Sequence, residues 1–385
     1  MTSKYSMKHS ILSGNNPFYN VTLSESVEQY LEENIDMNTS LQDMVTYLKK
    51  LVDNADEEML KKLILQFKKE RIASLVSRAI KQRGLAGVKI DQANESLTGA
   101  LHNVSATPGE LASFLKKVVK GSFGIEKKLK VGIHNFSDIV PTSDPVLSQI
   151  WERLYNDTKA LTSGITSSGK GEFLLMVLGG TESSKNNDEG GDISFNGIGC
   201  EVKLPGGQIW ARSPETVYRD ELHAGIVRDA LLVDHSDIFT KQEADVFFKK
   251  YKTSSKSTYF FTELLQYIKD KGGDKQKAMA VTSSITKSIY LKNYNKLKPI
   301  FYKCITRSLK FDTETFQKEM IVFNLNLYKS IKGWKYMILF NSRTEVNKIA
   351  IIESGDDIKS GKISSDLFDF KKGPENLIFY TAKTF

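Results

Sequence analysis

The sequence has few cysteines and no long apolar run, and each absence excludes a class of protein. Cys200 and Cys304 are the only cysteines among 385 residues, and no CxxC spacing occurs. This argues against a disulfide framework or a zinc knuckle and fits a reducing compartment. No apolar run approaches the roughly 20 residues that a membrane span needs, and the N-terminal residues lack the apolar core of a secretory signal. We therefore expect a cytoplasmic protein without membrane contact.

The composition is otherwise that of an ordinary globular protein, with 40% hydrophobic and 26% charged residues. Lysine and arginine outnumber the acids, 54 to 46, which gives a net charge of +8. A basic chain favours an anionic partner, with nucleic acid as the leading candidate. Many lysine-rich proteins are basic without binding nucleic acid, so the charge does not decide the function.

The first part of the chain has the periodicity of helices. The clearest helix start is at Thr107, which is placed to cap the helix, with Pro108 at the first helical position and Glu110 placed to complete a capping box. Gly121 is a natural end for this helix. We expect an all-α N-terminal domain over residues 1–140. Its lysine-rich polar faces could contact DNA phosphates, or they could simply be solvated.

From residue 141 the pattern changes to mixed α/β, and we expect one α/β domain over residues 141–385. A helical insertion is expected at about 215–315. The other expected elements are helices at Pro145–Leu161 and Lys170–Leu178 and strands at Ile321–Tyr328, Trp334–Phe340, Lys348–Ile352 and Leu377–Thr381.

The segment from Gly191 to Lys203, GDISFNGIGCEVK, predicts a β-hairpin. Asn-Gly at 196–197 is the strongest short-range signal for a type I′ turn. Counting from that turn pairs Phe195 with Ile198 and places Asp192 opposite Glu201. Strand alternation then separates an apolar face (Ile193, Phe195, Ile198, Cys200 and Val202) from a small or ionisable one (Asp192, Ser194, Gly199, Glu201 and Lys203).

Two carboxylates face each other in this register, with Cβ atoms about 5 Å apart. Like charges at that distance are destabilising unless a cation neutralises them, and hard oxygen ligands suit Mg²⁺. Lys203 lies on the same face as Glu201, where its ammonium can reach a phosphate or position a water. Asp192, Glu201 and Lys203 together have the chemistry needed for phosphodiester hydrolysis. A surface hairpin with a solvated Glu201–Lys203 pair is the alternative.

This arrangement resembles the PD-(D/E)XK, or restriction endonuclease-like, nuclease superfamily. The resemblance covers about residues 167–210 and assigns Asp192, Glu201 and Lys203 to the three motif positions. It implies a mixed sheet flanked by helices, and Mg²⁺, or Mn²⁺ in its place, held by the two acids and the Val202 carbonyl. It also implies a further acid on the preceding helix, where Glu172 is the only candidate. Gly191 stands where the family motif has proline.

Residues after the lysine are candidates for substrate contact. Gln208 and Arg212 could bind the substrate phosphate, and ordinary polar loop residues are the equal alternative. Glycines at 190, 191, 206 and 207 would allow a backbone to approach the site closely.

The leading hypothesis is a Mg²⁺-dependent DNA endonuclease of phage, mobile-element or restriction type, acting in the host cytoplasm if a phage encodes it. Enzymes of this kind often dimerise to cut two strands, so a homo-oligomer stays open. One alternative is a DNA-binding or virion-associated structural protein with an inactive nuclease fold. Another is a P-loop-like NTPase, because residues 164–170 match most of a phosphate-binding loop. Gly171 stands where that loop needs a hydroxyl, which disfavours the NTPase.

Overall fold

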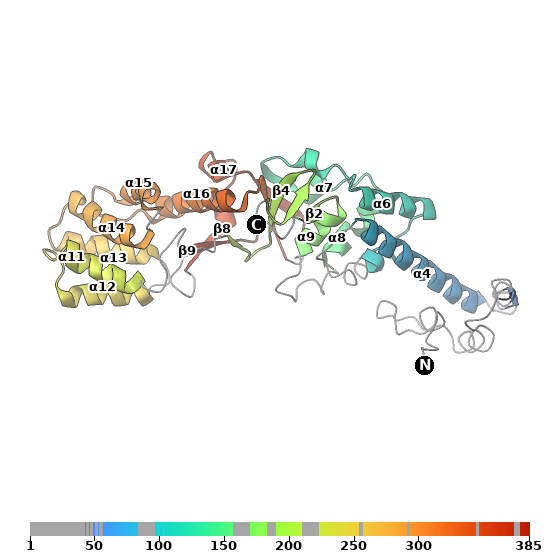
Figure 1. Cartoon of the computed structure of the whole chain (residues 1–385), viewed down its shortest axis with the longest axis horizontal. Helices are drawn as coiled ribbons and strands as arrows, with labels where there is room; N and C mark the ends of the chain where they lie inside the picture. The colour runs from blue at the N-terminus through green and yellow to red at the C-terminus, as the bar shows by residue number, and fades with distance from the viewer. Residues whose placement is uncertain are drawn as a thin grey trace. The chain divides into compact units, whose positions relative to one another are not determined.

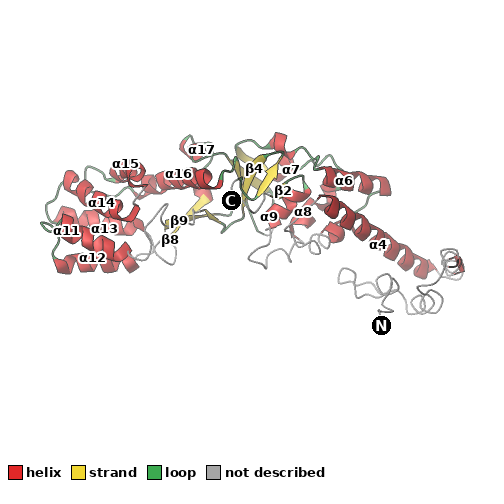
Figure 2. Ribbon diagram, in the orientation of Figure 1, coloured by secondary structure: helices red, strands yellow, loops and turns green. Residues whose placement is uncertain are grey.

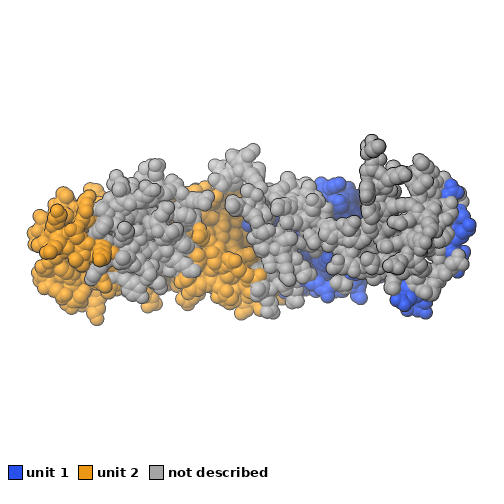
Figure 3. Space-filling model, turned by 90° about the horizontal axis from the view of Figure 1, so that it is seen from below, with its two compact units in different colours: residues 1–123, 141–179 blue, residues 124–140, 180–385 orange. Residues whose placement is uncertain are grey.

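The chain forms two compact units (Figure 3). One unit comprises Met1–Phe123 and Pro141–Gly179, and the other comprises Gly124–Val140 and Gly180–Phe385. The computed structural model describes isolated helical positions between 43 and 53 and the ranges 57–83, 97–102, 104–156, 170–182, 190–209, 223–253, 257–290, 293–343, 346–372 and 378–385.

The first unit is helical in its described residues. Its helices are α4 (Glu57–Arg83), α6 (Pro108–Lys120), α8 (Leu147–Asn156) and α9 (Lys170–Val177). Figure 1 labels each of them. None of the helices that the structure describes combines the length and apolar character that a membrane crossing requires.

Helix α6 begins and ends where its sequence predicts. The Thr107 side chain accepts from the Glu110 N–H at 3.3 Å, and a Glu110 carboxylate oxygen accepts from the Thr107 N–H at 2.8 Å. Gly121 ends the helix in the left-handed conformation, with φ 62°. The helix packs through its apolar face, whose buried members are Leu111, Phe114, Leu115 and Val118.

The second unit is built on a six-stranded mixed sheet with strand order β1-β7-β6-β4-β3-β2. Figure 2 draws strands in yellow. Strand β4 is antiparallel to β3 and parallel to β6. The central strands β6 and β7 are buried almost throughout, as their continuous apolar sequences require. The strands are β1 (Gly132–Asn135), β2 (Thr181–Glu182), β3 (Ile193–Phe195), β4 (Ile198–Lys203), β6 (Tyr336–Phe340) and β7 (Lys348–Ile352).

A second sheet has three strands in the order β5-β9-β8. Its strands are β5 (Gln208–Ile209), β9 (Ile378–Ala382) and β8 (Phe368–Lys372). Short helical elements complete the unit: η1 (Ile125–Lys128), α7 (Phe136–Ile139), α17 (Asp356–Lys359) and η4 (Ser365–Leu367).

Between β4 and β6 the described residues form the short strand β5 and then a series of helices, called the helical insertion below. They are α11 (His223–Asp234), α12 (Lys241–Thr253), α13 (Ser257–Asp270), α14 (Lys275–Tyr290), α15 (Tyr294–Cys304) and α16 (Thr313–Lys332). Near its start, α16 places Phe316 in an aromatic cluster with Phe261 and Phe301, and near its end it places Tyr328 beside Trp334. Both groups belong to one continuous core that extends into β6 and β7. Helix α16 therefore joins the helical insertion to the sheet (Figure 1).

Two expectations for secondary structure are wrong. Residues Ile321–Tyr328, predicted as a strand, belong to α16. The buried positions of this helix recur every three to four residues, and it is bounded by an Asp312 cap and by Gly333 in the left-handed conformation. The strand was expected because apolar residues alternate in this segment. On the helix the same residues lie on more than one side. Strand β1 lies inside the segment 1–140 that was assigned to helices.

The other predicted strands of the C-terminal part are confirmed. Strand β6 lies within Trp334–Phe340, β7 coincides with Lys348–Ile352, and β9 begins and ends one residue after Leu377–Thr381. Mixed α/β architecture is therefore confirmed for the second unit. The division differs from the predicted boundary at residue 140, because residues 124–140 belong to the sheet-containing unit and residues 141–179 belong to the helical one.

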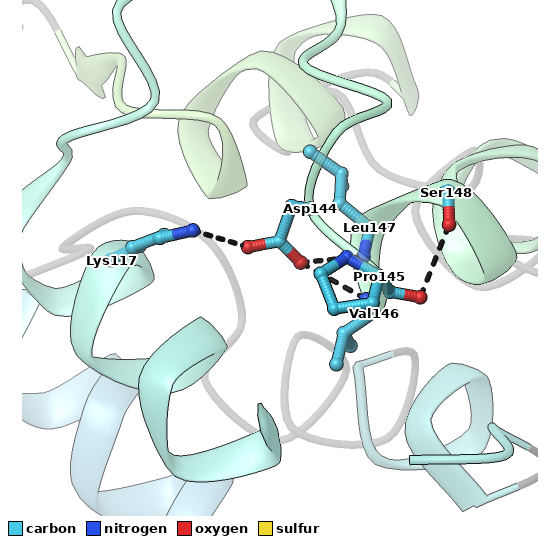
Figure 4. Close-up of polar contacts among 6 residues, drawn as sticks. All are labelled: Lys117, Asp144, Pro145, Val146, Leu147 and Ser148. Carbon is cyan, nitrogen blue, oxygen red and sulfur yellow. Dashed lines mark hydrogen bonds and ion pairs between the residues drawn. The ribbon is translucent and has the colours of Figure 1, made fainter. Parts of the chain in front are cut away.

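One buried carboxylate connects two helices of the first unit (Figure 4). Asp144 is 5% exposed, and one of its oxygens accepts from the Val146 and Leu147 N–H groups at 3.0 Å each. Its other oxygen pairs with the Lys117 ammonium at 2.6 Å. Asp144 thus caps the start of α8 and ties it to α6.

We expect Asp144→Ala to lower the free energy of unfolding by about 1–2 kcal/mol, because two N–H groups lose their acceptor. Asp144→Asn keeps that acceptor and loses only the pairing with a half-exposed lysine, so it should cost about 0.5 kcal/mol. Thermal and urea unfolding of the full chain measure both changes. Equal losses in the two variants would contradict the capping role.

Candidate functional site

The predicted hairpin is present with the predicted turn and register. Asn196 and Gly197 have φ of 49° and 82°, and positive φ at both central positions defines a type I′ turn. The pairs Phe195–Ile198, Ser194–Gly199 and Ile193–Cys200 all occur. The ladder stops there, so Asp192 lies directly before β3 and reaches the neighbouring strand through its side chain.

Glycines at the hairpin allow the backbone segment before β3 to lie close to the backbone of β4. A Cβ on Gly191 would lie 2.6 Å from the carbonyl carbon of Cys200, and one on Gly199 would lie 2.0 Å from the Gly190 oxygen. Neither contact is sterically allowed. Gly191 therefore has a backbone role at the position where the resembled motif has proline.

Both faces of the hairpin are covered. The apolar face is buried as expected, with Ile193, Phe195 and Cys200 at most 2% exposed, and burial raises the pKa of the Cys200 thiol to about 12. Glu201, on the opposite face, is also only 2% exposed. An ionisable side chain buried to this degree needs charge and hydrogen-bond partners.

Lys203 faces both Asp192 and Glu201. Its ammonium forms an ion pair with Glu201 Oε1 and lies 3.9 Å from Asp192 Oδ2. Asp192 Oδ2 also accepts from the Val202 N–H at 2.8 Å. The three residues that the sequence selected therefore lie together on one side of the hairpin.

The main chain of Val202 also faces Asp192. The N–H and C=O groups of one strand residue point to the same edge of the strand. Since the Val202 N–H contacts Asp192, its carbonyl also points to the edge that carries Asp192. This is the direction that a metal-ligating role for that carbonyl requires.

Tyr328 of α16 is a member of the cluster that the sequence analysis missed. Its hydroxyl donates to Glu201 Oε1, and its ring centroid lies 5.7 Å from the Lys203 ammonium. The residue lay in a segment interpreted as a strand. The caps of α16 at Asp312 and Gly333 were the signal that identifies a helix, but no local signal relates residue 328 to a strand 127 residues earlier.

Burial and neighbouring charges have opposing effects on the pKa values of the cluster. Burial raises the pKa of Asp192, opposed by the positive charge of Lys203 and reinforced by the negative charge of Glu201. Burial alone would lower the pKa of Lys203, but the charges of Glu201 and Asp192 outweigh it and raise that pKa. Lys203 is the ammonium that faces both acids, and the positive charge of Lys332 also acts to lower the pKa of Asp192.

The roles of three other predicted site residues stay predictions. Glu172 lies half-buried on α9, which belongs to the first unit, so its role stays a prediction. Gln208 is exposed on β5, where it pairs with Thr381 in the second sheet. Arg212 lies outside the described residues, as do residues 164–169 of the P-loop-like segment.

Comparisons with known proteins return no relatives. No family model, curated protein or solved structure matches this chain. Within the described ranges, no group of three or more His, Cys, Asp or Glu side chains is arranged to hold a metal. Among the described side chains of the hairpin, a metal could use the carboxylates of Asp192 and Glu201.

We expect Asp192→Asn to raise the melting temperature by a few degrees at neutral pH. Folding raises the pKa of Asp192, so above the ordinary aspartate pKa of about 4 the native state holds this carboxylate ionised at a cost in stability. Asparagine removes that cost and still accepts from Val202. The difference between the two proteins should shrink as the pH falls below about 4, where aspartate is protonated in both states.

Scanning calorimetry of both proteins over a range of pH tests this expectation. A lower melting temperature for Asp192→Asn at neutral pH would mean that attraction to Lys203 outweighs the burial of the acid.

Proposed function

We propose that this protein is a divalent-metal-dependent nuclease that hydrolyses DNA phosphodiester bonds at Asp192, Glu201 and Lys203. The observation that carries the proposal is the meeting of two carboxylates with one ammonium on one side of a hairpin. A mixed sheet with associated helices is the architecture that the PD-(D/E)XK resemblance implies, and the restriction endonuclease-like fold is part of the proposal.

The donor set suits Mg²⁺, with Mn²⁺ as its substitute. Mg²⁺ sites in nucleotide-processing proteins commonly use one or two carboxylates, with waters and substrate phosphates completing the shell. Asp192, Glu201 and the Val202 carbonyl would hold the ion, and Glu172 would assist. A bound ion would lower the pKa of a coordinated water and neutralise charge on the scissile phosphate.

Lys203 would act on the substrate directly. The neighbouring acids raise its pKa, so it stays protonated at neutral pH. Its four-carbon chain can turn the ammonium from the acids to a phosphate oxygen, where positive charge stabilises the charge that develops during attack. Gln208 and Arg212 would contact the substrate phosphate beside it.

DNA is the favoured substrate because cations gather on the helices of the first unit. The exposed lysines and arginines there include Lys68, Arg71, Arg78, Lys81, Lys116 and Lys120. Each phosphate that such a residue neutralises adds salt-sensitive affinity. Internal cleavage, a phage, mobile-element or restriction origin, and a cytoplasmic setting belong to this proposal.

One observation favours a second candidate function. Tyr328 and Lys203 satisfy Glu201 within the protein, as they would in a purely structural ion-pair network. The same fold could then serve as a DNA-binding or virion-associated protein without catalysis.

Cleavage of a supercoiled plasmid separates these two functions. The wild-type chain should nick the plasmid with Mg²⁺ and not with EDTA, and Lys203→Met should reduce the rate about 100-fold or more, because a charge that stabilises the transition state is lost. Lys277→Met is the matched control, since Lys277 is 30% exposed and pairs with Asp237 on the helical insertion. The control should cleave like the wild type. Cleavage in EDTA, or full activity of Lys203→Met, would contradict the proposed site.

Lys203→Met should also bind Mn²⁺ at least about threefold more tightly than the wild type, because an ammonium beside two carboxylates repels a second cation. Isothermal titration without DNA measures this affinity. Weaker binding in the variant would show that Lys203 organises the acids for the ion instead of opposing it.

A further inference from the structure

The Tyr328 hydroxyl contacts the one acid of the site that is almost fully buried. Tyr328 is 5% exposed, and its ring lies against Trp334, with ring centroids 6.4 Å apart. The ring is therefore fixed by packing, and the hydroxyl is hydrogen-bonded to the acid. A hydroxyl on a packed ring has little freedom to follow a moving partner.

Both protein contacts on Glu201 go to the same oxygen. The Tyr328 hydroxyl and the Lys203 ammonium each donate to Oε1. Neither of them engages Oε2. The contacts therefore fix the direction of the carboxylate and leave one oxygen for another ligand.

Asp192 has a similar arrangement. Its Oδ2 accepts from the Val202 N–H and faces Lys203. Neither of these two contacts involves Oδ1. Each acid thus has one oxygen held by the protein and one that these contacts leave available for an ion.

The two donors on Glu201 have different parts in a reaction. Lys203 must leave Oε1 if its ammonium turns to a phosphate. A tyrosine hydroxyl carries no positive charge that a phosphate would attract, and the ring of Tyr328 is held by the core. Tyr328 can therefore keep Glu201 oriented while Lys203 is engaged elsewhere.

We propose that Tyr328 is a positioning residue, which holds Oε1 of Glu201 so that Oε2 faces the divalent ion. This inference rests on the proposed metal-dependent nuclease. Hydrogen-bond partners of metal ligands orient those ligands, and their loss commonly costs 10- to 100-fold in metal affinity or activity. Tyr328 adds to the site a residue from α16, outside the hairpin that carries the motif.

The test is Tyr328→Phe in the full chain, which removes one oxygen and keeps the ring against Trp334. Tyr294→Phe is the matched control, because the Tyr294 hydroxyl is hydrogen-bonded to Ser283 Oγ within the helical insertion. The measurements are the Mn²⁺ affinity by titration calorimetry, kcat and KM for plasmid cleavage, and the melting temperature.

We expect Tyr328→Phe to weaken Mn²⁺ binding about tenfold and to lower kcat about tenfold with KM unchanged. Tyr294→Phe should match the wild type in affinity and kcat, although its melting temperature falls to a similar degree. A purely structural hydroxyl would change the melting temperature alone.

Wild-type affinity and kcat in Tyr328→Phe would overturn the inference while leaving the nuclease proposal in place. If the wild type binds Mn²⁺ without cleaving DNA, the nuclease proposal fails, and the ratio of the two affinities alone decides the role of Tyr328. If the wild type binds no Mn²⁺, both fail.

Discussion

The ion pair between Lys203 and Glu201 is the interaction on which the site depends. A carboxylate that is 2% exposed is tolerated only where a nearby positive charge and hydrogen bonds replace the lost water. Lys203 supplies the charge and Tyr328 supplies a hydrogen bond. Asp192 shares the same ammonium. The proposed binding of a divalent cation rests on these two acids.

The order of the strands requires a long connection between β4 and β6. Strands β4 and β6 are parallel neighbours, and parallel strands cannot be joined by a tight turn. The connection between them contains the helical insertion and ends in α16, which leads directly into β6. The same helix anchors Phe316 in the aromatic cluster and delivers Tyr328 to Glu201. Packing in the insertion and the geometry of the site are therefore linked through one helix.

The sequence could predict those features that depend on near neighbours. Asn196-Gly197 sets the turn, and the turn sets which side chains share a face. The Thr107 and Glu110 capping box is equally local. The burial of Glu201 and its contact with Tyr328 depend on a helix far along the chain, so no local pattern shows them. The strand expected at Ile321–Tyr328 is wrong because alternating apolar residues also occur on a helix, and Asp312 and Gly333 bound this one.

The most direct test of the account is a calorimetric titration of the full chain with Mn²⁺, compared with Glu201→Gln. Glutamine keeps an acceptor for Tyr328 and removes the negative charge that is proposed to bind the ion. The account predicts saturable binding by the wild type and its loss in the variant. Equal binding by both proteins, or none by the wild type, would contradict it.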